Sequence, residues 1–380
     1  MTRRLRLGQV GGGEGAFIGE VHRIASRIDN RFELVAGAFS ATPRKARASA
    51  EALGVSADRA YDDFRMMAER EAARPEGIDA VSIVTPNHMH YPVAREFLRH
   101  GIHVICDKPL TSDLEDARRL AAIAGTAEGE AGTRFFVTYN YSAYPLIRQA
   151  REMVAKGDLG EIRVIQVEYA QGWLASPVER EGLKQAEWRT DPKRSGDGGA
   201  IGDIGTHAFH LAGFVTGLKA EALAADLHRF GPGRALDDNA HVLLRYSGGA
   251  RGVLWCSQVA VGAENGLRLR VFGDRGGLVW AQESPNEMFF APLGGAEQRI
   301  TRNGAGFAAG PIVSARLPAG HPEGYLEGFG ALYAGIADVL SGQDAGQADH
   351  LPGIADGLRG MEFINAAIES GKAGAAWIGF

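Results

Sequence analysis

Residues Leu5–Gly19 read LRLGQVGGGEGAFIG, and this stretch decides the fold of the 380-residue chain. A weakly alternating strand ends at a glycine-rich turn, after which apolar residues recur at helical spacing as far as Ile28. This strand–turn–helix context makes a G-x-G-x-x-A match credible as a dinucleotide site. A loop without side chains lets the backbone approach the pyrophosphate, whose charge faces the helix N-terminus. We therefore predict dinucleotide contacts at Gly11, Gly13, Ala16, Phe17 and Ile18.

Further strands follow the first one, separated by helical patterns. Strand-like apolar runs are expected over 34–39, 78–84, 102–106 and 135–141. Strands that alternate with helices in this way form a doubly wound parallel sheet. We predict an α/β protein in which residues 1–138 form an N-terminal Rossmann domain that binds a dinucleotide.

Two of these strands end in polar residues at the edge where open α/β sheets bind ligands. The strand 78–84 continues into 85–87, Thr-Pro-Asn, and the strand 102–106 continues into 107–109, Asp-Lys-Pro. A residue before proline is biased to an extended conformation, which aims the lysine side chain. His88 and His90 lack a nearby carboxylate or third histidine, so no metal is expected. Cofactor contacts are predicted at Thr85, Pro86, Asn87, His90, Asp107 and Lys108.

The residues after the second strand bear on which cofactor is bound. An acidic residue there would hold the adenosine ribose of NAD. The chain has Ser40 instead, followed by Arg44 and Lys45. A hydroxyl and cations suit a 2′-phosphate better than a carboxylate would, so Ser40 and Arg44 slightly favour NADP, while NAD stays open. The alternative is that Arg44 and Lys45 begin the next helix and face solvent.

The second half of the chain has a different periodicity. Alternating runs over 162–169, 241–246, 252–257 and 267–272 are typical of a mostly antiparallel sheet. We predict a C-terminal α+β domain, residues 139–380, built on a large open sheet. A partner can cover the free face of such a sheet, so a homodimer or homotetramer is expected.

One predicted helix of this half carries two groups suited to proton transfer. The helix is expected from about Asp203 to Phe214, and it places Asp203 and His207, four residues apart, on one face. A carboxylate beside an imidazole can fix its tautomer and hold its pKa in a useful range. The alternative is structural: Asp203 caps the helix and His207 packs against the sheet.

Composition narrows the class of protein. The net charge of −5 argues against a nucleic-acid partner. No apolar run reaches the roughly 18 residues of a membrane span, and the basic N-terminus lacks the apolar region of a signal peptide. Cys106 and Cys256 lie in apolar runs and are expected to be buried free thiols. We expect a cytoplasmic protein without a membrane partner.

Four motifs in this order resemble the Gfo/Idh/MocA family of nicotinamide-dependent oxidoreductases. They are the glycine loop 11–19, the turn 85–87, the strand end 107–109 and the segment 202–207. Two further features depart from the family pattern, because the glycine loop is longer than usual and an acidic residue after the second strand is missing. Asp107 also stands where glutamate is usual.

The resemblance implies a dehydrogenase acting on CH-OH groups of a sugar, an inositol or a glycoside, with hydride passing to NAD(P). It implies a catalytic set of Lys108, Asp203 and His207, in which either Lys108 or His207 is the base. A fixed cation at the reacting oxygen stabilises charge that develops in the transition state. Sugars are often held by aromatic faces with polar rims, and substrate contacts are predicted at Lys108, Asn140, Tyr141, Trp173, Trp188, Arg189, Asp203 and His207.

Two other functions fit the same motifs. One is a redox-neutral glycoside hydrolase of the same family, which oxidises and re-reduces a ring carbon with tightly held NAD. The other is a non-enzymatic nucleotide-sensing regulator, for which a missing catalytic lysine or histidine would be expected. Lys108 and His207 are both present, which favours an enzyme. The substrate, the oxidised carbon and the direction of the reaction stay open.

Overall fold

A computed structural model describes residues 3–308, 310, 315–343 and 346–380. Contacts divide the chain into two compact units, one of Met1–Asn140 with Tyr325–Leu358 and the other of Tyr141–Gly324 with Arg359–Phe380. A single division at 138/139 assigns 325–358 to the second domain, whereas the contacts group that segment with the first unit. None of the helices in the described part of the chain is long and apolar enough to cross a membrane.

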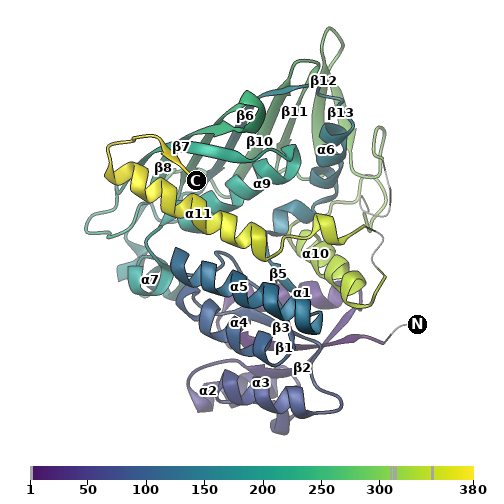
Figure 1. The fold of residues 1–380 in the computed structure, drawn as a ribbon, viewed down its shortest axis with the longest axis vertical. Helices are drawn as coiled ribbons and strands as arrows, with labels where there is room; N and C mark the ends of the chain where they lie inside the picture. The colour runs from purple at the N-terminus through teal and green to yellow at the C-terminus, as the bar shows by residue number, and fades with distance from the viewer. Residues whose placement is uncertain (1–2, 309, 311–314, 344–345) are drawn as a thin grey trace. The chain divides into compact units, whose positions relative to one another are not determined.

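The first unit contains a five-stranded parallel sheet (Figure 1) in the order β2-β1-β3-β4-β5. The registers pair Gly11 with Val84, Ile83 with Cys106, and Cys106 with Val137. Because all five strands run the same way, their carboxyl ends lie at one edge of the sheet. This confirms the predicted doubly wound fold. The strands are β1 (Leu5–Gly11), β2 (Phe32–Ala38), β3 (Ala80–Val84), β4 (His103–Cys106) and β5 (Phe135–Val137).

Helices connect and cover these strands. They are α1 (Phe17–Ile28), α2 (Pro43–Ala52), α3 (Phe64–Ala73), α4 (His90–Arg99), α5 (Leu114–Ala131) and α10 (Tyr325–Leu340). Helix α10 comes from far along the sequence but packs on α1. Its Tyr333 ring meets Phe32 edge to face at 5.4 Å, and its hydroxyl lies 2.9 Å from His22 Nδ1. This buried contact explains why Tyr325–Leu358 groups with the first unit.

The second unit contains a nine-stranded sheet in the order β13-β12-β11-β10-β6-β9-β8-β7-β14. Only the β6–β9 pair is parallel among these neighbours, which confirms the mostly antiparallel sheet. The strands are β6 (Ile162–Ala170), β7 (Ala220–His228), β8 (Asn239–Tyr246), β9 (Arg251–Ser257), β10 (Gly266–Gly273), β11 (Gly276–Ala281), β12 (Glu287–Pro292), β13 (Gln298–Thr301) and β14 (Ile378–Gly379).

The two faces of this sheet differ in burial. In β8, Val242 and Leu244 are buried while His241, Leu243 and Arg245 are exposed. Such alternation is typical of a sheet with one packed face and one open face. The unit also contains α6 (Pro145–Ala155), α7 (Lys184–Arg189), α8 (Pro192–Ser195), α9 (Thr206–Thr216) and, from Arg359 onward, α11 (Ile354–Lys372). Helices α9 and α11 meet where the rings of Phe209 and Phe363 stack at 4.2 Å.

Candidate functional site

The glycine loop makes a close backbone contact with the first turn of α1. Gly11 and Gly12 have φ of +82° and +67°, a region that L side chains rarely adopt. A Cβ atom on Gly19 would lie 2.4 Å from the Gly12 Cα atom, so neither position has room for a side chain. Helix α1 begins after Ala16 without a side-chain cap, which leaves its first N–H groups for another acceptor. The G-x-G-x-x-A match identified Gly11 and Gly13 but missed the Gly12–Gly19 contact.

This cradle fits a dinucleotide on the chain's own geometry. The Thr85 hydroxyl, at the end of β3, is buried and has no hydrogen-bond partner among the described residues. A Cβ atom on Gly11 would lie 2.9 Å from Thr85 Cγ2, so this hydroxyl-bearing residue adjoins the glycine loop. Backbone N–H groups at a helix N-terminus and an orphaned hydroxyl are the groups that a pyrophosphate and a ribose require.

The end of β2 provides a hydroxyl and a cation near the same loop. The Gly13 amide donates to the Phe39 carbonyl at 3.2 Å, which joins the loop to this strand end. Ser40 Oγ accepts a hydrogen bond from the Thr42 amide at 3.1 Å, and Arg44 is exposed in the first turn of α2. The geometry is compatible with both possibilities drawn from the sequence, a phosphate contact and a solvent-facing helix start.

The Asp107 carboxylate holds the backbone of Lys108. Its Oδ1 atom accepts hydrogen bonds from the Lys108 amide and from Thr138 Oγ1, both at 2.8 Å. The Asp107 amide donates to the Ile83 carbonyl at 3.0 Å, and the Lys108–Pro109 peptide is cis. Asp107 was expected at the cofactor, and the contacts of its Oδ1 atom join the Lys108 amide to Thr138, which follows β5.

Both ring nitrogens of His90, which was predicted to contact the cofactor, face main-chain carbonyl oxygens. The side chain is fully buried at the first position of α4. Its Nδ1 atom lies 2.8 Å from the Pro109 carbonyl oxygen and its Nε2 atom 3.0 Å from the Thr85 carbonyl oxygen. Burial lowers the pKa of His90, opposed by the charge of Asp107 and by the two carbonyls. The cofactor contact predicted at His90 stays a prediction, and both ring nitrogens lie against main-chain carbonyls.

In the second unit, a buried carboxylate fixes the segment before the candidate catalytic helix. Asp237 accepts hydrogen bonds from the Gly199 amide at 2.7 Å and the Ile201 amide at 2.8 Å. Burial raises the pKa of Asp237 to about 6, while these two amides act in the opposite direction. A Cβ atom on Gly199 would lie 1.9 Å from the Asp237 carbonyl oxygen, so only glycine fits there.

A π-helical turn, residues Ile201–Gly205, carries Asp203 and continues directly into α9. The expected helix is thus present, and it begins with the wider turn that recurs at functional sites. Asp203 lies within this turn rather than at its cap, and its Oδ2 atom accepts a hydrogen bond from Gln258 Nε2 at 2.8 Å. Arg189 Nε is 3.3 Å from the same oxygen. These contacts argue against a capping role for Asp203.

Aromatic side chains surround His207 within the second unit. The Tyr141 ring meets the buried His207 ring edge to face at 5.0 Å, and the Tyr169 ring lies 6.2 Å away. The two tyrosine hydroxyls are 2.6 Å apart, and Tyr169 donates to Asn265 Oδ1 at 2.8 Å. The Tyr141 hydroxyl, expected at the substrate, is therefore part of an internal network.

The other predicted substrate residues lie in mixed environments. The Arg189 guanidinium stacks on the Trp188 ring at 4.4 Å, and both side chains are half-buried. Trp173, also half-buried, donates from Nε1 to Gln171 Oε1 at 3.0 Å. Asn140 is buried in the first unit, and its amide donates to the Thr138 carbonyl at 2.9 Å.

Sequence reasoning missed three residues of this site. Gln258 directly follows β9, so a polar residue at a strand end was an available signal. Tyr169 occupies a buried position in the alternating strand β6, which indicated a core residue but no role. Asn265 lies just before β10 and had no recognisable local signal.

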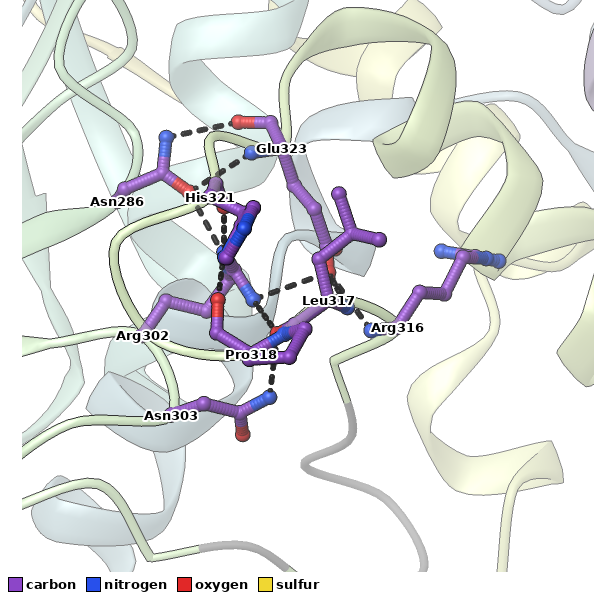
Figure 2. Close-up of polar contacts among 8 residues, drawn as sticks. All are labelled: Asn286, Arg302, Asn303, Arg316, Leu317, Pro318, His321 and Glu323. Atoms are coloured by element: carbon purple, nitrogen blue, oxygen red, sulfur yellow. Dashed lines mark hydrogen bonds and ion pairs between the residues drawn. The ribbon is translucent and has the colours of Figure 1, made fainter.

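A separate polar cluster orders the loop that precedes α10 (Figure 2). Buried Arg302 pairs with buried Glu323 at 3.0 Å. The same Glu323 oxygen accepts hydrogen bonds from the amides of Arg316 and Leu317, both at 2.7 Å. Asn286 donates to the Glu323 carbonyl at 2.9 Å and accepts from Arg302 Nε at 2.8 Å. An unpaired buried charge would destabilise the fold, so the pairing of Arg302 with Glu323 gives this cluster a structural role in holding the loop.

One unit has a glycine cradle at the edge of a parallel sheet, and the other has a carboxylate and an imidazole four residues apart on one helical segment. These are features of a dinucleotide-dependent oxidoreductase. Residues 5–136 match the description "Oxidoreductase family, NAD-binding Rossmann fold", and residues 147–279 match "GFO/IDH/MocA C-terminal domain". The chain belongs to the Gfo/Idh/MocA family of oxidoreductases, and its first unit is an NAD-binding Rossmann domain.

Several characterised or solved proteins are similar over most of their length. An oxidoreductase from Sinorhizobium meliloti is 50% identical, with a TM-score of 0.89 over 99% of this chain and 100% of that chain. An inositol dehydrogenase homolog from Azotobacter vinelandii, solved with NADH and myo-inositol, is 35% identical, with a TM-score of 0.90 over 100% and 98%. Levoglucosan dehydrogenase from Pseudarthrobacter phenanthrenivorans is 26% identical over 75% of this chain and 76% of its own length.

Proposed function

We propose that this chain catalyses hydride transfer between a nicotinamide cofactor and a secondary alcohol or ketone of a cyclitol or sugar. The observation that carries the proposal is the pair of Asp203 and His207 on one helix, with Asp203 held by Gln258 and Arg189. The similar protein solved with NADH and myo-inositol supports a cyclitol substrate, and levoglucosan dehydrogenase supports an anhydrosugar as the next class to test.

The cofactor is proposed to lie on the carboxyl edge of the parallel sheet. The glycine loop and the first turn of α1 would hold its pyrophosphate, through Gly11, Gly13, Ala16, Phe17 and Ile18. Thr85, Pro86 and Asn87 would contact the part of the cofactor that lies beyond the pyrophosphate. When bound, the nicotinamide ring accepts or returns the hydride. The relative solved with NADH supports NAD as the cofactor. The hydroxyl of Ser40 and the cation of Arg44 suit the 2′-phosphate of NADP, so NADP is the alternative.

The chain's own residues would handle the proton and the developing charge. We assign His207 to accept the hydroxyl proton, because its buried imidazole is fixed by aromatic neighbours. Asp203 would orient that ring or bind a neighbouring hydroxyl. Lys108 would donate to the reacting oxygen, whose negative charge grows in the transition state. The same lysine is the second candidate for the base.

Further substrate contacts are proposed for the aromatic and polar residues predicted from the sequence. Trp173 and Trp188 offer aromatic faces for the apolar side of a ring, and Arg189 and Asn140 offer polar contacts for its hydroxyls. The Tyr141 contribution is indirect, since its hydroxyl bonds to Tyr169. We also propose that the open face of the nine-stranded sheet is covered by a second copy, which light scattering of the purified protein would test.

The test is cofactor reduction followed by absorbance with NAD and with NADP across inositols, anhydrosugars, pentoses, hexoses and glycosides. Lys108→Ala and His207→Ala are measured beside the wild type. Turnover of a cyclitol or sugar that both substitutions abolish would support the proposal. Absence of turnover with every alcohol, together with nicotinamide retained in the purified protein, would contradict it and point to a redox-neutral glycoside hydrolase.

A further inference from the structure

His90 lies between two turns that follow neighbouring strands of the parallel sheet. Its Nε2 atom is 3.0 Å from the carbonyl oxygen of Thr85, which begins the turn leading to Asn87. Its Nδ1 atom is 2.8 Å from the carbonyl oxygen of Pro109, the residue that follows Lys108. One fully buried ring therefore contacts the main chain of both turns.

Both carbonyls can only accept hydrogen bonds, so the ring must be the donor in each contact. A neutral imidazole has one N–H and serves one carbonyl at a time, whereas an imidazolium serves both. In either state the ring lies against both turns and joins them to α4, because His90 is the first residue of that helix. Losing the donor would leave the carbonyl that it serves without this partner, which costs about 1–3 kcal/mol for an unsatisfied buried group.

The neighbouring contacts restrict Lys108 from the other side. Asp107 Oδ1 accepts the Lys108 amide at 2.8 Å and is itself held by the Thr138 hydroxyl. The Lys108 backbone is thus bonded before the side chain through Asp107 and after it through Pro109 and His90. The lysine side chain is half-buried, and these bonds fix the main chain from which it extends.

We propose that His90 is a positioning residue that couples the turn of Thr85–Asn87 to the turn of Lys108. Through this coupling the position of Asn87, proposed to contact the cofactor, and the position of Lys108 depend on each other. This inference rests on the proposed function for its kinetic part, because Lys108 and Asn87 receive their roles there. Its structural part stands on the two carbonyl contacts alone. Displacing a catalytic group by about 1 Å can cost about 100-fold in rate.

The experiment compares His90→Phe, which fills the space without a donor, with His90→Gln, whose side-chain NH2 group can still donate to a carbonyl. His100→Gln is the matched control, because His100 caps the opposite end of α4 and its Nδ1 contacts the carbonyl and the carboxylate of Glu96, on the same helix, at 2.9 and 3.8 Å. Hydrogen–deuterium exchange of peptides covering 85–90 and 103–108 is measured together with NADH affinity, kcat and KM.

We expect His90→Phe to increase exchange several-fold in both peptides and to lower kcat about 10- to 100-fold, with KM changed less. His90→Gln should fall between this variant and the wild type, and His100→Gln should match the wild type. Combined with Lys108→Ala, His90→Phe should cost little further activity, because coupled residues are not additive.

Unchanged exchange in either peptide would overturn the inference. So would a lower melting temperature with an unchanged kcat per folded molecule, which is the result expected of a purely structural histidine. If the wild type turns over no alcohol, the proposed function fails separately. The exchange of the two turns and the NADH affinity of the same variants then still decide whether His90 couples them.

Discussion

The strand-end turns of the first unit and the candidate catalytic helix of the second unit hold their predicted site residues mainly by different means. In the first unit the bonds go to the main chain: Asp107 accepts the Lys108 amide, and His90 contacts two carbonyls. In the second unit the bonds join side chains, as in Gln258 to Asp203 and Tyr169 to Asn265.

This difference determines how much of each site a short sequence motif can reveal. The bond between Asp107 and the Lys108 amide joins neighbours in sequence, so this motif contains part of its own support, whereas His90 and Pro109 are 19 residues apart. The side-chain bonds span 55 residues between Asp203 and Gln258 and 96 residues between Tyr169 and Asn265. A short motif therefore identifies Asp203 and His207 but not the residues that hold them.

The largest expected effect tests whether the two regions contribute equally to the chemistry. Lys108→Met and His207→Ala should each lower kcat about 1,000-fold, because general acid–base groups contribute about 100- to 10,000-fold. NADH affinity, measured by fluorescence titration, should change little in His207→Ala. Lys108→Arg serves as the control that retains the charge without the ammonium geometry. A Lys108→Met enzyme with normal kcat would leave the chemistry to the second unit alone.

Acid should weaken the first unit through His22. This histidine is fully buried against Ser82 and Tyr333, and burial lowers its pKa to about 4. The unfolded chain binds the proton near pH 6.5, so stability is lost as pH falls from 6.5 to 4, by up to about 3 kcal/mol. Urea unfolding at pH 7 and pH 5 should show a smaller loss in His22→Gln. An equal loss in both proteins would refute this assignment.

Acid should act in the opposite direction on the second unit through Asp237. Burial raises its pKa to about 6, above the value near 3.9 of an unfolded aspartate. The folded state then binds the proton more tightly, so this group stabilises the fold as pH falls from 6 to 4, by up to about 3 kcal/mol. Asp237→Asn removes this dependence. The contribution of Asp237 is obtained from urea unfolding as the wild-type pH dependence minus that of the variant.

A smaller effect is expected in the second unit from Gln258, which holds Asp203 and is not itself assigned a step in the reaction. Gln258→Leu removes the 2.8 Å hydrogen bond to Asp203, and we expect kcat to fall about tenfold, in line with the loss of one hydrogen bond to a charged group. Gln258→Glu, which places a like charge beside Asp203, should be worse. If both variants keep the wild-type kcat, the side-chain network would have no part in activity.

The smallest expected effect concerns cofactor choice at the end of β2. Arg44 is exposed, so its contact with a 2′-phosphate would be screened by solvent, and Arg44→Ala should lower kcat/KM for NADP about three- to tenfold. The value for NAD should stay the same. Arg47→Ala is the control, because Arg47 lies on the same helix as Arg44 and its ion pair goes to Asp62, which precedes α3. Equal losses with both cofactors would place Arg44 outside the 2′ site.

Much of the first unit was predictable from the chain. The alternation of strands and helices and the glycine turn predicted the parallel sheet, and Lys108 was found because it ends a buried strand before a proline. The sequence did not predict the contacts of the His90 ring, because a histidine near a strand end can face either a ligand or the protein interior. Only the packing of α4 turns this ring toward two carbonyls.

The sequence by itself determined the parallel sheet, the open antiparallel sheet and the order of the motifs, because these follow from local periodicity and from residues with special backbone freedom. Tertiary structure alone decided that α10 returns to the first unit and that Gln258, Tyr169 and Asn265 support the catalytic helix. These contacts join residues far apart in the chain. Their partners are set by packing, which no short stretch of sequence contains.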